Sequence, residues 1–255
     1  MSAGECDLDT IMKMSELQPH ERMGVSRRSI DRAGDLLRGR TLFGEDLLSN
    51  DEHDAINLLE RFRAEFEAPL RAVVGNLRDL VVAEGPTAQP TERLKRVPRI
   101  IEKLVRHPTM QLSRMQDIAG CRIVVPDLES AARIQNGLMT DMTVERVDDY
   151  NRSPKSTGYR ALHVIVRAQA SSVEIQVRTP WQQAWARSIE LLDARLNLSL
   201  KDGLGPEALL SYVVPIAYAL EVTYRGDRLN PATDAELEAL RAEAERWMRE
   251  RGKET

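Results

Sequence analysis

Cysteine is scarce in this sequence, and long apolar runs are missing. The 255 residues include two cysteines, Cys6 and Cys121, which lie far apart and offer no framework of paired bridges. This usage is typical of a reducing compartment, so we expect a cytoplasmic protein. The N-terminus has no basic start followed by an apolar run, and the most apolar stretch, residues 212–220, is short and contains Pro215. We therefore expect neither secretion nor a membrane-spanning segment.

Metal ligands and excess positive charge are also in short supply. The four histidines show no metal-ligand spacing with one another or with the cysteines, which argues against a zinc or iron site. The formal net charge is −4 at pH 7 and the sequence pI is near 5.7. A dedicated duplex-binding protein would usually be basic overall, so phosphate recognition here would need a local cluster of cations.

The length allows one substantial domain with helical additions. We divide the chain into four parts: a mobile N-terminus at 1–25, a helical flank and linker at 26–90, a core at 91–196 and a C-terminal helical extension at 197–255. The linker is the Gly- and Pro-rich stretch 85–90, after which the composition changes.

The order of predicted elements defines the fold class. Helical spacing predicts a helical segment over 51–84, bent or divided by Pro69, and a short helix at 98–106. Strands are predicted at 121–126, 143–149, 161–167 and 173–179, with a helix at 128–139 between the first two. We therefore expect an α/β (α+β) fold in which a mixed sheet is flanked by N- and C-terminal helices.

Three helices are predicted in the C-terminal third, at 180–196, at 206–220 and from Thr233 onward. Thr233 and Glu236 have the spacing of a capping box, which would begin the last helix. One face of that helix is apolar and must cover the core or a partner subunit. A homo-oligomer formed through these helices is therefore one hypothesis.

A cluster of cations lies at the start of the core, where Arg99, Lys103 and Arg106 share one face of the short predicted helix. Residues Ile100, Ile101, Leu104 and Val105 would point away from them into the core. Such a row, preceded in the chain by Arg93 and Lys95, can grip a triphosphate at several oxygens. The same pattern is also typical of a solvated charged face.

Two carboxylates mark the predicted strands. Asp117 precedes an Ala-Gly turn that leads into a strand, where it can bind magnesium or, alternatively, cap the turn. Glu174, Gln176 and Arg178 alternate with apolar residues along another strand. If that strand lies inside the sheet, this polar face must line a wet cleft, whereas on an edge strand it is merely solvated.

A loop with lysine, small hydroxyls and glycine precedes the third predicted strand. Lys155 and Gly158 suit a close approach to phosphate or ribose, and Tyr159 can stack on a base. His163 fits a hydrogen-bonded structural histidine as well as a catalytic base. Together with the cations and the two carboxylates, this loop meets the needs of phosphoryl-type transfer.

These motifs, taken in order, resemble the synthetase domain of the RelA/SpoT family, and in particular its single-domain small alarmone synthetases. The resemblance runs from about Thr91 to Glu190. It is carried by Arg93-Leu94-Lys95 with Lys103, Gln116-Asp117-Ile118-Ala119-Gly120-Cys121-Arg122, Gly158-Tyr159-Arg160-Ala161-Leu162-His163, and Glu174-Ile175-Gln176-Val177-Arg178-Thr179. It implies a nucleotidyltransferase-like fold and the transfer of pyrophosphate from ATP to the ribose 3′-hydroxyl of GDP or GTP.

The resemblance also implies roles for single residues. Asp117 and Glu174 would be the catalytic pair and bind Mg²⁺, and Glu174 would help to deprotonate the attacking hydroxyl. The ATP side would comprise Arg93, Lys95 and Lys103, with Arg99 and Arg106 from the cation row and Arg122 in support. The acceptor side would comprise Lys155, Tyr159 and His163, with Gln176 in support.

Two departures from the family pattern keep alternatives open. Arg99 stands where the family usually has serine, and Ser156-Thr157 stand where long members usually have Pro-Asn. Because His53-Asp54 has no suitable companions for a hydrolase site, we expect synthesis without hydrolysis. One alternative is the same chemistry on adenosine nucleotides or on the 3′ end of tRNA, although the acidic net charge disfavours tRNA. Another is a catalytically silent nucleotide-binding regulator.

Overall fold

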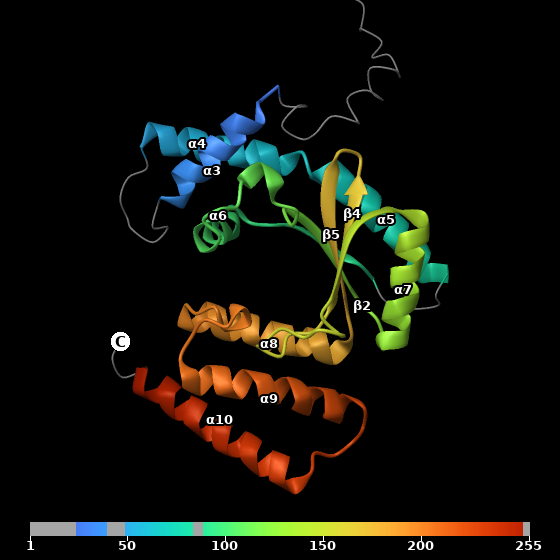
Figure 1. Ribbon diagram of the computed structural model, residues 1–255, viewed down its shortest axis with the longest axis vertical. Helices are drawn as coiled ribbons and strands as arrows, with labels where there is room; N and C mark the ends of the chain where they lie inside the picture. Colours follow the sequence, from blue (N-terminus) through green and yellow to red (C-terminus); the bar gives the residue numbers. More distant parts are fainter. Residues whose placement is uncertain (1–23, 40–48, 84–88, 252–255) are drawn as a thin grey trace, which may run out of the picture. The chain divides into compact units, whose positions relative to one another are not determined.

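The computed structural model describes residues 24–39, 49–83 and 89–251 (Figure 1). The helices in these ranges are α3 (Arg27–Arg38), α4 (Asn50–Ala64), α5 (Glu67–Ala83), α6 (Val97–Arg106), α7 (Leu128–Asp141), α8 (Pro180–Leu196), α9 (Glu207–Tyr224) and α10 (Pro231–Arg251), with short 3₁₀ turns at Leu112–Arg114 and Leu200–Asp202. The strands are β1 (Thr91–Leu94), β2 (Ala119–Val124), β3 (Thr143–Asp149), β4 (Leu162–Ala168) and β5 (Ser171–Arg178). Residues 1–23 of the predicted N-terminal segment and residues 85–88 of the predicted linker lie outside these ranges.

The five strands form one mixed sheet in the order β1-β2-β5-β4-β3, so β5 is a central strand. Strand β1 pairs with β2 in antiparallel fashion, with Arg93 opposite Gly120 and Leu94 opposite Ala119. The two-residue connection at Gln169 and Ala170 joins β4 to β5 as a hairpin, and Gln169 adopts a positive φ of 51° there. The predicted mixed sheet with flanking helices is confirmed, whereas strand β1 had no counterpart among the predicted elements.

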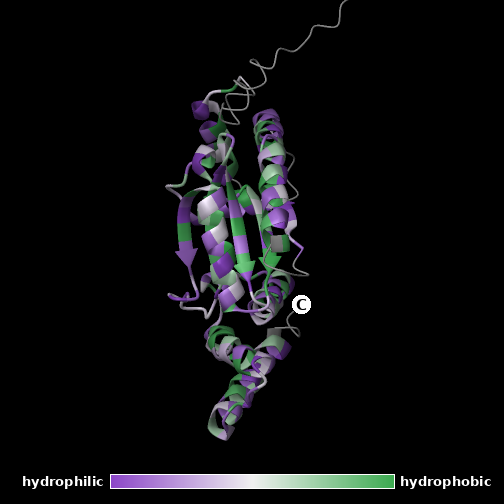
Figure 2. Ribbon diagram, turned by 90° about the vertical axis from the view of Figure 1, so that its right-hand side faces the viewer, coloured by the Kyte–Doolittle hydropathy of each residue, from purple (hydrophilic) through white to green (hydrophobic). Residues whose placement is uncertain are grey.

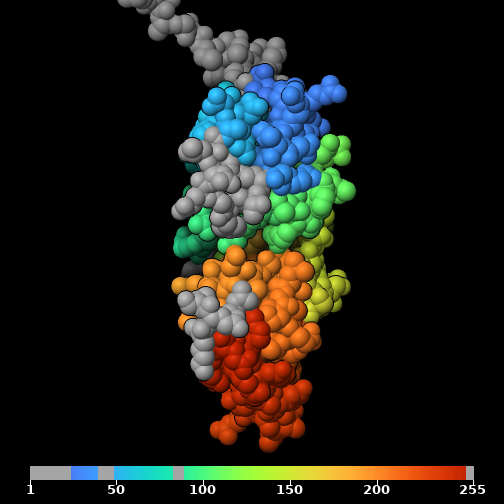
Figure 3. Space-filling model, turned by 90° about the vertical axis from the view of Figure 1, so that its left-hand side faces the viewer, coloured from blue at the N-terminus to red at the C-terminus, as the bar shows by residue number. Residues whose placement is uncertain are grey.

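Apolar spacing explains which face each N-terminal helix buries. Helix α4 begins with a capping box between Ser49 and Glu52. It ends before Glu65, so the break between the two helices precedes Pro69, which lies in the first turn of α5. Helix α3 packs against α4 and α6, and the side chains of α3 and α4 lie next to each other on the surface in Figure 3. In Figure 2 the helices carry both hydrophobic and hydrophilic residues along their length, as burial of one face requires.

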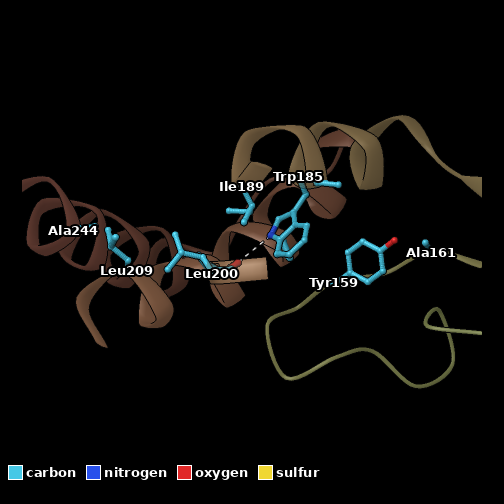
Figure 4. Packing of buried hydrophobic residues seen from close by; sticks show 10 residues of the cluster. Tyr159, Ala161, Trp185, Ile189, Leu200, Leu209 and Ala244 are labelled. Carbon is cyan, nitrogen blue, oxygen red and sulfur yellow. Dashed lines mark hydrogen bonds between the residues drawn. The ribbon is translucent and has the colours of Figure 1, made fainter. Parts of the chain in front are cut away.

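The C-terminal helices α8, α9 and α10 pack in sequence around a buried cluster that includes Tyr159, Trp185 and Leu209 (Figures 1 and 4). Trp185 Nε1 donates a hydrogen bond to the carbonyl oxygen of Val213 at 3.0 Å, which satisfies its polar atom inside the core. Helix α10 begins at Pro231, and Thr233 donates its backbone N–H to Asn230 Oδ1 at 2.9 Å. The predicted cap at Thr233 is therefore wrong, because Asn230 caps the helix and proline occupies its first position.

The chain divides into two compact units, and each strand except β1 runs from one unit to the other or ends at their boundary. The first unit comprises residues 1–123, 133–147 and 164–176, and the second comprises 124–132, 148–163 and 177–255. The four-part division expected from the sequence is a different description and stays a prediction. Within the described residues, no helix is both long and apolar enough to cross a membrane.

Candidate active site

Asp117 is held between two lysines in the first unit. Its Oδ2 atom lies 2.6 Å from Lys95 Nζ and 2.7 Å from Lys103 Nζ. The three side chains are mostly buried, with exposed fractions of 16%, 13% and 22% for Asp117, Lys95 and Lys103. The other carboxylate oxygen, Oδ1, is buried and has no hydrogen-bond partner among the described residues. A buried carboxylate with one unsatisfied oxygen is costly unless a further ligand binds it.

Strand pairing brings these residues together across the sequence. The β1–β2 ladder continues by one bond beyond Leu94, because the Lys95 N–H donates to the carbonyl oxygen of Ile118 at 2.7 Å. This bond places Lys95 beside the segment that carries Asp117. Lys103 reaches the same carboxylate from the last turn of α6, whose opposite face buries Ile100, Ile101 and Leu104. Val105 is 46% exposed, so the expectation that it points into the core is wrong.

Burial and charge act in opposite directions on this cluster. Burial raises the pKa of Asp117, but attraction to Lys95 and Lys103 and the hydrogen bonds they donate outweigh it, so the net pKa lies below the ordinary value of 3.8. Burial is also the largest influence on Lys95, and together with the positive charges of Lys103 and Arg93 it lowers the pKa of that lysine despite Asp117. An additional negative group beside Lys95 would therefore stabilise its charged form.

We expect the exchange Lys103→Met to raise the pKa of Asp117 and to reduce stability in acid. A carboxylate whose folded pKa is depressed contributes stability above its unfolded pKa and loses it as the pH falls through the folded pKa. Without Lys103, burial raises the folded pKa, so this loss begins at higher pH than in the wild type. We expect a destabilisation of roughly 1–2 kcal/mol near neutral pH. Urea unfolding at a series of pH values from about 3 to about 7 measures both effects.

The matched control is Arg99→Met on the same helix. Arg99 Nη1 pairs with Glu102 Oε2 at 2.7 Å on the surface, with 51% of the arginine side chain exposed. Loss of this pair should cost at most about 0.5 kcal/mol and should not change the pH range in which stability falls in acid. If Lys103→Met and the wild type lose stability over the same acidic pH range, the attraction between Lys103 and Asp117 does not set the pKa of Asp117.

Glu174 lies in the middle of the sheet, beside a glycine. A Cβ atom at Gly120 would lie 3.9 Å from both Cβ and Oε2 of Glu174, which places the two residues on the same face of adjacent strands. Arg93 is opposite Gly120 across the β1–β2 pair, so Arg93, Gly120 and Glu174 form a row on this face. Strand alternation then puts Lys95, two residues after Arg93, on the same face.

The carboxylates of Asp117 and Glu174 therefore lie on one face of the sheet, together with the lysines. Since β5 is a central strand, the edge-strand alternative for its polar face is excluded. Gln176 Nε2 donates to Glu174 Oε2 at 2.7 Å and fixes the orientation of that side chain. A buried thiol lies nearby: burial, Glu174 and Glu92 raise the pKa of Cys121 to about 12, so it stays protonated.

The donor set fits a magnesium ion that takes most of its ligands from elsewhere. The described residues contain no group of three or more histidine, cysteine and acidic side chains that could hold a metal. They do supply the unsatisfied Asp117 Oδ1 and the side-chain-free space at Gly120 beside Glu174 Oε2. Mg²⁺ is commonly held by one or two carboxylates, with substrate phosphates and water completing its shell. Binding of Mg²⁺ by Asp117 and Glu174 stays a prediction.

The other predicted ATP-binding cations occupy different surroundings. Arg99 is paired with Glu102 on the exposed side of α6, and Arg106 is exposed at the end of that helix. Arg122 lies on β2 opposite Thr91, whose hydroxyl donates to its carbonyl oxygen at 3.4 Å. Of the cations predicted to share one face of α6, Lys103 pairs with Asp117, whereas Arg99 pairs with Glu102.

The predicted acceptor residues Lys155, Tyr159 and His163 form a cluster of their own in the second unit. Tyr159 is 1% exposed, and its hydroxyl lies 2.7 Å from His163 Nε2 and accepts a hydrogen bond from Arg178 Nη2 at 3.0 Å. Lys155 Nζ lies 5.2 Å from the ring centre of Tyr150 and 5.4 Å from that of Tyr159. Stacking of Tyr159 on a base stays a prediction.

Sequence reasoning gave two members of this cluster no role. Arg178 is fully buried and donates to both Tyr159 and Gln183 Oε1, and its signal was present in the alternating polar face of the fourth predicted strand. Lys201 Nζ lies 5.2 Å from the Tyr159 ring centre, where it adds a second lysine. No spacing in the sequence indicates Lys201, because it reaches the ring from a turn after α8.

Comparison with known proteins agrees with the motif order. Residues 92–191 match a family model described as "Region found in RelA / SpoT proteins". The uncharacterized protein Rv1366 of Mycobacterium tuberculosis is 36% identical over 134 residues, which cover 49% of this chain and 46% of that protein. GTP pyrophosphokinase YwaC of Bacillus subtilis is 27% identical over 165 residues, which cover 59% of this chain and 78% of that protein. The chain thus spans about half the length of the first curated relatives it matches.

Solved structures show the same fold. Small alarmone synthetase 1 of Bacillus subtilis, bound to its product pppGpp, superimposes with a TM-score of 0.57 at 24% identity, covering 67% of this chain and 94% of that one. Small alarmone synthetase 2 of the same organism gives a TM-score of 0.56 at 23% identity, covering 66% and 95%. The predicted fold class is confirmed by these likenesses.

Proposed function

We propose, on the premise that residues 92–191 match the family model of RelA/SpoT proteins, that this protein is a nucleotide pyrophosphokinase that transfers pyrophosphate from ATP to the 3′-hydroxyl of GDP or GTP. The observation that carries the proposal is the cluster of Lys95, Asp117 and Lys103 on the same face of the sheet as Glu174. This arrangement offers cations for phosphates and two carboxylates for an attacking hydroxyl and a metal ion.

The transfer needs charge neutralisation and a proton acceptor. The acceptor's 3′-oxygen forms a bond to the β-phosphorus of ATP, the bond from that phosphorus to the α–β bridging oxygen breaks, and AMP leaves. Lys95 and Lys103, whose charges now meet on one oxygen of Asp117, would bind the phosphate oxygens of ATP. Glu174, oriented by Gln176, would take the proton of the 3′-hydroxyl. When bound by Asp117 and Glu174, Mg²⁺ supplies further neutralisation of phosphate charge.

Recognition of the acceptor is proposed for the second cluster, in which Lys155, His163 and Lys201 surround Tyr159. Two lysines beside an aromatic ring suit a nucleotide that combines phosphates with a base. Arg99 stays with Glu102 on the surface, so its departure from the family pattern leaves the Asp117 cluster intact. We propose synthesis without hydrolysis. His53 makes a local contact, its Nδ1 lying 3.1 Å from the carbonyl oxygen of Ser49.

An acceptor panel tests the proposal. The purified full chain is incubated with Mg²⁺ and ATP labelled at the γ-phosphate, and GDP, GTP, ADP or tRNA is offered in parallel. We expect label on GDP and GTP, carried as an added pyrophosphate, together with one AMP per product. Label on ADP or tRNA alone would show that the protein transfers pyrophosphate but that its acceptor is not a guanine nucleotide. Nucleotide binding with no product on any acceptor at high protein concentration would overturn the proposal in favour of a silent regulator.

A further inference from the structure

A cavity of about 300 Å³ lies in the first unit. It is lined by the start of α3, the α4–α5 corner, the 3₁₀ turn at Leu112–Arg114 and the β4–β5 hairpin. None of Lys95, Lys103, Asp117 and Glu174 lines it. The volume is at the lower end of the range that small-molecule sites occupy.

The floor of the cavity is apolar. Phe62 and Phe66 line it with ring centres 5.3 Å apart at an interplanar angle of 89°, and Met115 lies beside them. All three are at most 5% exposed, so they belong to the core and form a rigid wall. A wall of two aromatic rings and a thioether favours a flat apolar group.

The mouth of the cavity is cationic. Arg27, Arg114 and Arg167 line it, and no acidic side chain does. Arg167 pairs with Glu145, whose other oxygen accepts a hydrogen bond from Ser172 Oγ at 2.6 Å. Arg27 and Arg114 are exposed and make no ion pair with any residue in the described parts of the chain. Two guanidinium groups without an ion pair to any described residue attract an anion at one opening and can bind it through paired hydrogen bonds.

A buried polar atom at the cavity has no partner. Ser171 is 2% exposed and lines the cavity, and its Oγ has no hydrogen-bond partner among the described residues. The neighbouring polar groups are satisfied: Ser113 bonds to Asp31 through its N–H at 2.9 Å and its hydroxyl at 3.1 Å, and Gln116 Oε1 accepts from Arg146 at 3.0 Å. A buried hydroxyl without a hydrogen-bond partner, among neighbours that have partners, indicates that a ligand atom forms the missing hydrogen bond.

We propose that this cavity is a second ligand site, which binds a small organic anion made of a phosphate or carboxylate group and a flat apolar ring. The ring rests on Phe62, Phe66 and Met115, the anionic group binds Arg27 and Arg114, and Ser171 Oγ donates a hydrogen bond to the ligand. The site adjoins the candidate active site along the chain, since Gln116 precedes Asp117 and Ser172 lies two residues before Glu174 on β5.

Phenyl phosphate is a suitable probe because it joins one ring to one phosphate. Isothermal titration calorimetry of the full chain without nucleotide should show saturable binding, which the variants assign either to the cavity or to the lysine cluster. Inorganic phosphate, which lacks the ring, and phenol, which lacks the charge, should each bind at least about fivefold more weakly. The variant Arg114→Gln should weaken phenyl phosphate binding by about tenfold, and Ser171→Val, which also fills space, by a similar factor.

Two control variants separate this site from other cations. Arg78→Gln removes an exposed arginine of α5 that is not part of the cavity and should leave the Kd within about twofold. Lys103→Gln removes one charge from the cluster around Asp117, and it should also leave the Kd for phenyl phosphate unchanged. An effect of Lys103→Gln without any effect of Arg114→Gln would place the probe at the lysines and overturn the proposal. Equal binding of phenyl phosphate and inorganic phosphate would overturn the proposal that the cavity binds a ring. Because no turnover is measured, these outcomes are independent of the proposed pyrophosphokinase activity.

Discussion

Replacing Glu174 by glutamine is expected to lower pyrophosphate transfer by at least about 10³-fold while the protein keeps its fold. The exchange removes one negative charge and the basic oxygen that would accept the 3′-hydroxyl proton. It preserves the size of the side chain, and an amide oxygen can still accept the 2.7 Å hydrogen bond from Gln176 Nε2. Steady-state rates with saturating ATP and GDP measure the loss, and a thermal unfolding midpoint shows whether the fold is retained.

The matched control is Glu60→Gln. Glu60 is an exposed residue of α4 whose Oε2 lies 2.9 Å from Arg63 Nη1 in a surface ion pair. It should change the rate by less than about twofold, because surface ion pairs contribute little and Arg63 keeps the hydrogen bond from its Nε to the carbonyl oxygen of Lys95 at 2.8 Å. A Glu174→Gln variant that retains wild-type rates would show that the proton goes elsewhere and that the polar face of β5 has another use.

The interior strands could be predicted from the sequence because burial leaves a strong pattern. The strand predicted at 173–179 is observed at Ser171–Arg178, and the strand predicted at 121–126 is observed at Ala119–Val124. Each end differs from the prediction by one or two residues. Strand β1 could not be found in this way, since Thr91, Glu92 and Arg93 are all exposed and show no alternation. Only its pairing with β2 makes it a strand, and pairing between distant segments leaves no local signal.

The candidate site shows the same division between local and long-range information. The residue types could be predicted, because a carboxylate before a strand and a cation row on a helix are local patterns. The convergence of Lys95 and Lys103 on one oxygen of Asp117 depends on the β1–β2 register and on the packing of α6, and neither can be read from periodicity. For the same reason the row predicted on α6 separates in the structure, and Arg99 turns to Glu102.

Helix boundaries fail for a different reason, which is competition between neighbouring signals. Thr233 and Glu236 have capping-box spacing, yet Asn230 followed by Pro231 places a better cap and a pre-organised first residue upstream. Helix α3 lies within the helical flank predicted at 26–90, but its bounds were not predicted. Its buried residues Ile30, Ala33, Gly34 and Leu37 have helical spacing, although two of them are small and glycine disfavours a helix. Gly34 allows a close approach to the turn at Leu112, where a Cβ atom would lie 2.8 Å from Leu112 Cβ.

The exchange Gly120→Val should abolish transfer almost as completely as the loss of Glu174, although Gly120 carries no chemical group. A Cβ atom at this position would lie 3.4 Å from the Glu174 carbonyl oxygen and 3.9 Å from Glu174 Oε2, so alanine fits and the two further methyl groups of valine extend toward the carboxylate. Valine favours the strand itself, but Gly120 is buried, so its side chain should cost about 1–3 kcal/mol of stability, and the thermal unfolding midpoint is measured together with the rates. We expect a rate loss of at least about 10²-fold for valine and less than about tenfold for alanine. Gly75→Ala, where a Cβ atom would meet nothing within 4 Å, is the control for a glycine exchange elsewhere in the unit. The graded loss would show that the space beside Glu174 holds reacting groups, whereas equal rates for glycine, alanine and valine would show that the reaction does not use this face of the sheet.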